Sequence, residues 1–177
     1  VARSFAYGLS NFTRGVFCGG STGSNSDVID YITIASTGNA TDFGNMQNAR
    51  TATAGCASTT RGVIFGGDQI GGQTDTIDYI TIGSTGNASD FGDLTEGKWW
   101  CSNASSSTKG FTIGGENNSA AVNVIETITT ASTGNSSDFG DSTIARSIHT
   151  SGSNSTRAIT AGGVEGTNVI DYFTMAS

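Results

Sequence analysis

An internal repeat of about 48 residues constrains the fold of this chain more than any other feature of its sequence. A basic residue begins a short run that ends in a pair of glycines four times, at positions 47 or 48 residues apart: Arg14, Arg61, Lys109 and Arg157. An acidic residue inside an apolar run follows each time: Asp30, Asp78, Glu126 and Asp171. A period of this length is typical of architectures whose units cannot bury their own faces and pack on their neighbours.

Each repeat contains the signals of four short β-strands separated by turns. In the second repeat these strands cover approximately residues 50–57, 61–66, 76–82 and 89–91. In the third strand Ile77 and Tyr79 point to one side, and Asp78, Ile80 and Ile82 to the other, so both faces carry apolar groups. Charged residues make only 13% of the chain, and the helix formers Lys and Glu are scarce. The sequence therefore predicts an all-β fold.

Sheets with two apolar faces need cover on both sides. The blades of a β-propeller supply it to one another, and so do the stacked rungs of a β-solenoid. We expect a single domain over residues 1–177 built as a propeller, with a stacked solenoid array as the alternative. Its four repeat units cover residues 2–48, 49–96, 97–144 and 145–177. Each unit is expected to hold four short antiparallel strands, except that the last unit lacks its fourth.

The order of these signals resembles the kelch repeat over essentially the whole chain. Aromatic residues recur in the third strand (Tyr31, Tyr79, Tyr172) and in the fourth (Phe43, Phe91, Phe139), the latter where kelch repeats usually carry Trp. The third unit departs from the pattern with Thr127 in place of Tyr, and the chain has no proline. The resemblance implies a kelch-like β-propeller.

The two near-identical stretches 29–44 and 77–92 are similar, more narrowly, to kelch-like repeat proteins of tailed bacteriophages. That resemblance implies a virion component, often part of a tail fibre, and hence an extracellular location.

Kelch propellers usually close with six or seven blades, whereas this chain begins with the first strand of one unit and stops after the third strand of its fourth. We therefore expect further repeats outside this segment, or copies of the chain that complete one another's unpaired edges in a homo-oligomer.

The repeated charges are interpreted as structural ion pairs, because buried charges need partners and a catalytic carboxylate is not expected once in every unit. Two sets of bases could pair with the acids, one at the second strand and one at the first: Arg14, Arg61, Lys109 and Arg157, or Arg3, Arg50, Lys98 and Arg146. The third unit has Lys at both places and Glu instead of Asp, so the sequence leaves the two sets undecided.

Several classes of function are disfavoured. The net charge of −7 argues against a nucleic-acid binder, and no apolar run is long enough for membrane insertion. His149 is the only histidine, so neither a catalytic triad nor a histidine-bound metal has support, and no cofactor motif is present. The odd number of cysteines, at Cys18, Cys56 and Cys101, forms no disulfide framework. We expect a protein that is not an enzyme and holds neither metal nor cofactor.

The connection between the Gly pair and the third strand is where the repeats differ most in content. Its polar residues are the candidate ligand-binding groups: Asn25, Gln69, Asn117, Asn118 and Glu165. Variable loops on a rigid scaffold are the usual place for binding specificity. The favoured hypothesis is a structural or adhesive virion module, a fibre or decoration protein, that binds other virion proteins and touches cell-surface glycan. The alternative is a kelch-type scaffold for protein–protein interaction.

Overall fold

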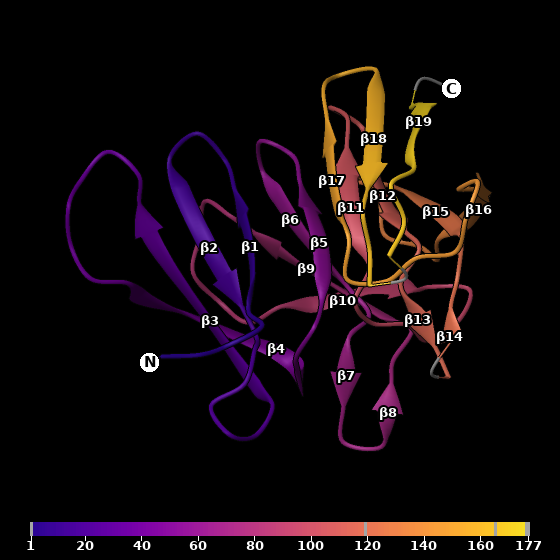
Figure 1. The fold of residues 1–177 in the computed structure, drawn as a ribbon. Coiled ribbons are helices and arrows are strands. Elements are labelled where there is room, and N and C mark those ends of the chain that lie inside the picture. The colour runs from indigo at the N-terminus through magenta and orange to yellow at the C-terminus, as the bar shows by residue number, and fades with distance from the viewer. Residues whose placement is uncertain (1, 119, 165, 176–177) are drawn as a thin grey trace.

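The computed structural model describes residues 2–118, 120–164 and 166–175. All the regular secondary structure in this part of the chain is β-strand, which confirms the all-β prediction. The strands form four successive antiparallel sheets and two small hairpins, and none of these sheets closes into a barrel (Figure 1). In each of the four sheets, strands that follow one another in the unit are neighbours.

The first sheet contains β1 (Tyr7–Ser10), β2 (Arg14–Cys18), β3 (Ser26–Thr33) and β4 (Thr41–Arg50). The second contains β5 (Ala54–Ala57), β6 (Arg61–Phe65), β9 (Thr76–Thr81) and β10 (Ser89–Asp93). The third contains β11 (Ser102–Ser105), β12 (Lys109–Ile113), β15 (Val124–Thr129) and β16 (Ser137–Asp141). The fourth contains β17 (Thr150–Ser153), β18 (Arg157–Ala161) and β19 (Ile170–Thr174). The hairpins are β7 (Asp68–Gln69) with β8 (Gly72–Gln73), and β13 (Glu116–Asn117) with β14 (Ala120–Ala121).

The first strand of the second unit is shorter than expected. It was predicted over residues 50–57, but β5 begins at Ala54, and Arg50 instead ends β4. The reason is Ala52, whose φ of 54° takes the backbone out of the extended region. The basic residue therefore lies at the end of the last strand of the preceding sheet, ahead of the strand that it was expected to open.

Three apolar clusters lie between successive sheets. The first joins Ile29 and Phe43 to Ile80 and Ile82 of the second unit. In the second cluster, Phe65 and Ile77 meet Ile128 of the third unit. In the third, Phe111 and Ile113 meet Ala158 and Met175 of the fourth. Ile77 and Ile80 of β9 thus enter opposite interfaces, as the alternation along that strand predicts. Each sheet obtains its core from its neighbours.

The linker that follows the third strand is hydrogen-bonded to the preceding sheet. The amide of Gly86 donates to the carbonyl of Phe43 at 2.8 Å, and that of Ala88 donates to Asn45 at 2.8 Å. Gly134 and Ser136 repeat this pattern against β10. These two linkers therefore extend the edge of the sheet before them and fix the spacing between units.

Candidate functional site

The bases that precede the first strand of each unit hold the repeated acids. Arg3 lies 2.7 Å from Asp30 and Lys98 lies 2.9 Å from Glu126, and the pairs Arg50–Asp78 and Arg146–Asp171 occupy the equivalent places. The structure thereby decides between the two sets of bases that the sequence left open. The acid in each case comes from the third strand, so every pair ties the entry of a unit to the middle of its own sheet.

The Arg50–Asp78 pair is completely buried, and both residues make further hydrogen bonds. Arg50 also donates to the carbonyls of Gly66 at 3.2 Å and Thr76 at 2.9 Å. The side-chain amide of Gln47 donates to Asp78 Oδ1 at 3.0 Å. Burial lowers the pKa of Arg50 and raises that of Asp78, because each charge has lost its water. Both oxygens of the Asp78 carboxylate are therefore occupied within the framework.

The other set of bases stacks on aromatic rings. The guanidinium carbons of Arg14, Arg61 and Arg157 lie 4.5, 4.4 and 4.8 Å from the ring centres of Tyr31, Tyr79 and Tyr172. Such cation–π contacts contribute about 0.5–1 kcal/mol at partly exposed sites. The third unit has Lys109 and Thr127 at these two places and lacks both partners at once.

These arginines also link units. Arg14 donates to the carbonyl of Ile82 at 2.9 Å, and Arg61 donates to that of Thr130 at 3.0 Å. Aromatic residues of the fourth strand fill the same interfaces, where Phe43 and Phe91 are 2% exposed. Phe139 is packed against Phe111 and Phe173 in the third cluster. The repeated acids are therefore held within their own sheets, whereas Arg14, Arg61 and the repeated Phe residues lie at the interfaces between sheets.

The variable connections lie at one end of the sheets, where the β7–β8 and β13–β14 hairpins project downward in Figure 1. Two candidate ligand groups in them make internal contacts: Asn25 donates to the carbonyl of Asp68 at 2.9 Å, and Asn117 donates to Glu96 at 2.6 Å. Gln69 is half-buried, and Asn118 is exposed with a φ of 47°. Glu165 lies outside the described residues.

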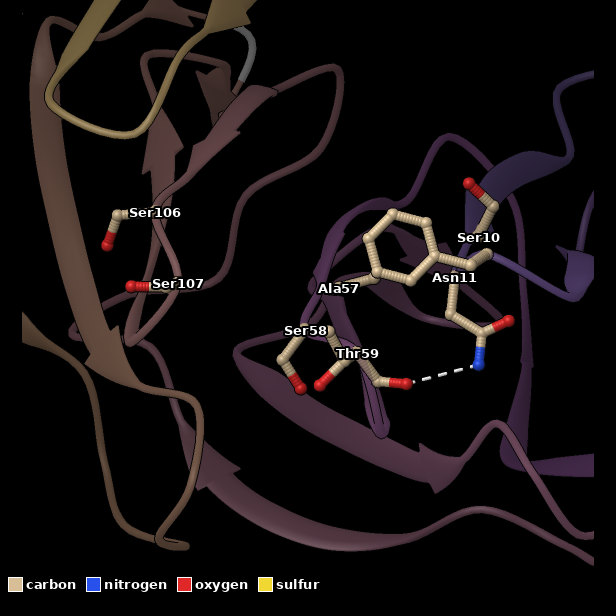
Figure 2. A pocket seen from close by; sticks show the side chains of 8 residues that line it. Ser10, Asn11, Ala57, Ser58, Thr59, Ser106 and Ser107 are labelled. Carbon is tan, nitrogen blue, oxygen red and sulfur yellow. Dashed lines mark hydrogen bonds between the residues drawn. The ribbon is translucent and has the colours of Figure 1, made fainter.

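A cavity lies at the opposite end of the sheets. It has a volume of about 410 Å³ and is lined by turns between the first and second strands of the first three units (Figure 2): Ser10, Asn11, Phe12, Ala57, Ser58, Thr59, Ser106 and Ser107. None of these side chains carries a charge. Phe12 is 88% exposed. A hollow of this size suits a small-molecule group, and its lining offers one aromatic face among hydroxyl and amide groups.

The shape of this cavity comes from the capping of its turns. Asn11 Oδ1 accepts hydrogen bonds from the amides of Thr13 and Arg14 at 2.9 and 2.8 Å, and Ser58 and Ser106 cap the next two turns in the same manner. The Asn11 amide also donates to the carbonyl of Thr59 at 3.1 Å, which holds two neighbouring turns together (Figure 2). Sequence reasoning missed the cavity, which three separated segments create.

A line of main-chain hydrogen bonds, which the sequence did not reveal, joins the units just before their first strands; it is called the inner line below. The amides of Ala52, Trp100 and Ile148 donate to the carbonyls of Phe5, Ala52 and Trp100, respectively, in the unit before. All four residues have φ between 47° and 54°, which is a costly conformation for residues other than glycine. They line a hollow of about 220 Å³. Their side chains are all apolar and differ in size, and each residue stands two positions after the paired base of its unit.

The remaining chemical groups are part of the packing. Ser102 Oγ lies 2.7 Å from His149 Nε2 and also bonds Ser151, and Ser102 is 5% exposed. Burial raises the pKa of Cys18 and of Cys56 to about 12. Within the described residues, no cluster of three His, Cys, Asp or Glu side chains could hold a metal ion, and no helix could cross a membrane.

Comparison with known proteins adds no relative: no protein-family model matches this sequence, and no curated protein matches it either.

Proposed function

We propose that this chain is a non-enzymatic structural and adhesive module of an extracellular particle, namely a fibre or decoration protein of a bacteriophage virion. In this role it binds other virion proteins through its framework and contacts glycan on the host surface through its turns. The pairing of the third-strand acids with bases of their own units supports a framework role, because these carboxylates already hold a counter-charge.

The same proposal takes the four sheets as blades of a kelch-like β-propeller. Support comes from the apolar clusters between sheets, from the neighbouring first strands β1, β5, β11 and β17, and from the main-chain line at their inner ends. A radial array of this kind leaves the turns at both ends free to bind.

The observation that carries the glycan proposal is the uncharged cavity beside Phe12. Sugars present apolar C–H faces and many hydroxyls, so they bind best to an exposed aromatic ring with hydroxyl and amide groups around it. Phe12 supplies the ring, and Ser10, Thr59 and Ser107 supply exposed hydroxyls that take no part in turn capping. The uncharged lining favours neutral sugars over acidic ones.

The test is binding of the full chain to an array of bacterial capsule and lipopolysaccharide glycans. We expect neutral glycans to bind and Phe12→Ala to weaken that binding about tenfold, the effect of losing about 1.4 kcal/mol of aromatic contact. Ile70→Ala is the matched control, because Ile70 is 96% exposed on the β7–β8 hairpin at the other end of the sheets. Absence of glycan binding, or equal binding by both variants, contradicts the glycan proposal.

A second candidate function, a scaffold for protein–protein interaction, is favoured by the exposure of Ile70 and Val164. These apolar side chains are 96% and 63% exposed in the variable connections. Large exposed apolar residues on a binding loop often anchor a protein partner. If this function is correct, Ile70→Ala abolishes capture of a purified virion protein and Phe12→Ala leaves it intact, the reverse of the glycan result.

A further inference from the structure

Both ends of the array expose a face that every internal interface buries. We propose that copies of this chain associate head to tail, with the outer face of the fourth sheet of one copy packed on the outer face of the first sheet of the next. This contact is independent of glycan binding and would bring together the same faces of the first three strands that pack on one another within the chain.

The outer face of the fourth sheet, here called the trailing face, contains Ile159, Ile170 and Tyr172. These side chains are 48%, 67% and 67% exposed. The strand registers make Val63 and Ile77 the equivalents of Ile159 and Ile170 in the second unit, and both are fully buried by the third unit. The trailing face is therefore an internal interface without its second half.

The outer face of the first sheet, here called the leading face, contains Phe17, Ile32 and Ile34. Phe17 is 40% exposed and Ile34 is 52% exposed. Their equivalents in the second unit, Ile64 and Ile82, are fully buried against the first unit. The two faces are thus the two halves of one kind of interface, carried at opposite ends of the chain.

Each face also carries a hollow. A hollow of about 210 Å³, lined in part by Phe17 and Ala40, marks the leading face. One of about 310 Å³, lined in part by Arg157 and Ile159, marks the trailing face. Burying such apolar surface stabilises an association by about 25 cal/mol per Å² before the entropy of association is subtracted.

A polar contact specifies the register. Within the chain, Arg14 and Arg61 lie over a tyrosine and donate across the interface to the carbonyls of Ile82 and Thr130. Arg157 has the same position over Tyr172 on the trailing face. The equivalent acceptor is the carbonyl of Ile34 in the second copy. A head-to-tail contact of this kind leaves one face free at each end, so assembly proceeds until it closes into a ring or grows into a filament.

The experiment is sedimentation of the full chain over a range of concentrations. We expect the mass to rise above the 18.0 kDa of one chain. Phe17→Glu and Ile170→Glu each remove one face and are expected to sediment as monomers. Mixed together, they still offer one intact leading and one intact trailing face, so they form a pair that grows no further. Ile70→Glu lies on neither face and should assemble like the unmodified chain.

A wild-type chain that stays monomeric at every concentration overturns the proposal, as does a mixture of the two folded variants that forms no pair. Self-assembly by either single variant points to a two-fold contact and overturns it as well. Circular dichroism reports whether the variants fold, and Ile34→Glu with Ile159→Glu provides a second pair of variants if one of the first does not.

Discussion

Lys98 Nζ lies 2.9 Å from Glu126 Oε1, and both side chains are completely buried. The equivalent pairs in the other three units are Arg with Asp. The third unit therefore changes both members together: the shorter reach of Lys is matched by the longer side chain of Glu. The position of the charge is maintained while the residues that supply it differ.

The first prediction is that this exchange is coupled. Lys98→Arg crowds a closed site and Glu126→Asp leaves a gap before Lys98, so each alone destabilises the fold. The double variant restores the pair of the other units and should recover about 1–3 kcal/mol relative to the sum of the single effects. Urea unfolding of the four proteins measures this coupling, and additive single effects would contradict it.

The second prediction separates the two sets of bases. Arg50→Met leaves Asp78 buried without its counter-charge and should lower the free energy of unfolding by about 3–5 kcal/mol. Arg61→Met removes a cation–π contact and one hydrogen bond at a half-buried site, and should cost about 1–2 kcal/mol. Equal losses of unfolding free energy in the two variants, measured by thermal or urea unfolding, would contradict a larger contribution from the buried ion pair.

The third prediction concerns pH. Burial alone would raise the pKa of Glu126, but Lys98 and hydrogen bonds from Ser136 and Thr95 hold the pKa below its usual value of 4.5. Because the pKa is lower in the folded state, the pair contributes stability above pH 4.5 that is lost as the pH falls through the folded pKa. The stability difference between the unmodified chain and Glu126→Gln should therefore shrink below pH 4.5. A difference that is constant from pH 7 to strongly acidic conditions would contradict this, measured by urea unfolding at each pH.

The fourth prediction compares two equivalent glycines. Gly92 has a φ of 144°, and a Cβ there would collide with the backbone of Gly134 in the next linker. Gly140 has a φ of 139° with nothing near its Cβ position. Backbone strain destabilises both alanine variants by about 1–3 kcal/mol, but Gly92→Ala must also displace the linker. Its melting temperature should fall further than that of Gly140→Ala, and the reverse order would contradict the linker contact.

The fifth prediction is that the thiols are inert in the folded protein. Burial raises the pKa of Cys18 and Cys56 to about 12, and it also raises that of Cys101. Because the thiolate is the reactive form, Ellman's reagent at pH 8 should label the folded chain slowly and all three cysteines after unfolding. Fast labelling of Cys56 in the folded chain, located by mass spectrometry, would show that the interface between the second and third sheets opens.

The all-β fold and the two apolar faces of each sheet were predictable, because alternation along 76–82 reports the two faces directly. The choice between Arg50 and Arg61 as partner of Asp78 was not, since sequence spacing does not tell which base the folded sheet brings near. One signal was present and unused: the unit that lacks Tyr at position 127 also has Lys109 instead of Arg, which indicates that this base belongs with the ring.

The cavity beside Phe12 had no such signal, because it is built from turns of three units whose approach depends on how the sheets pack. The inner line at Ala52 and Trp100 is made by main-chain atoms in an unusual conformation. Its one signal in the sequence, an apolar residue two positions after each paired base, was not used.

The attachment of each linker to the sheet before it has a mechanical consequence. Tension along the chain cannot release the second sheet without also shearing the bonds that Gly86 and Ala88 make with β4. Adjacent units thereby share the load, because these linker bonds must break before the two sheets can separate. Under repeated tension, this overlap makes the chain more resistant to rupture.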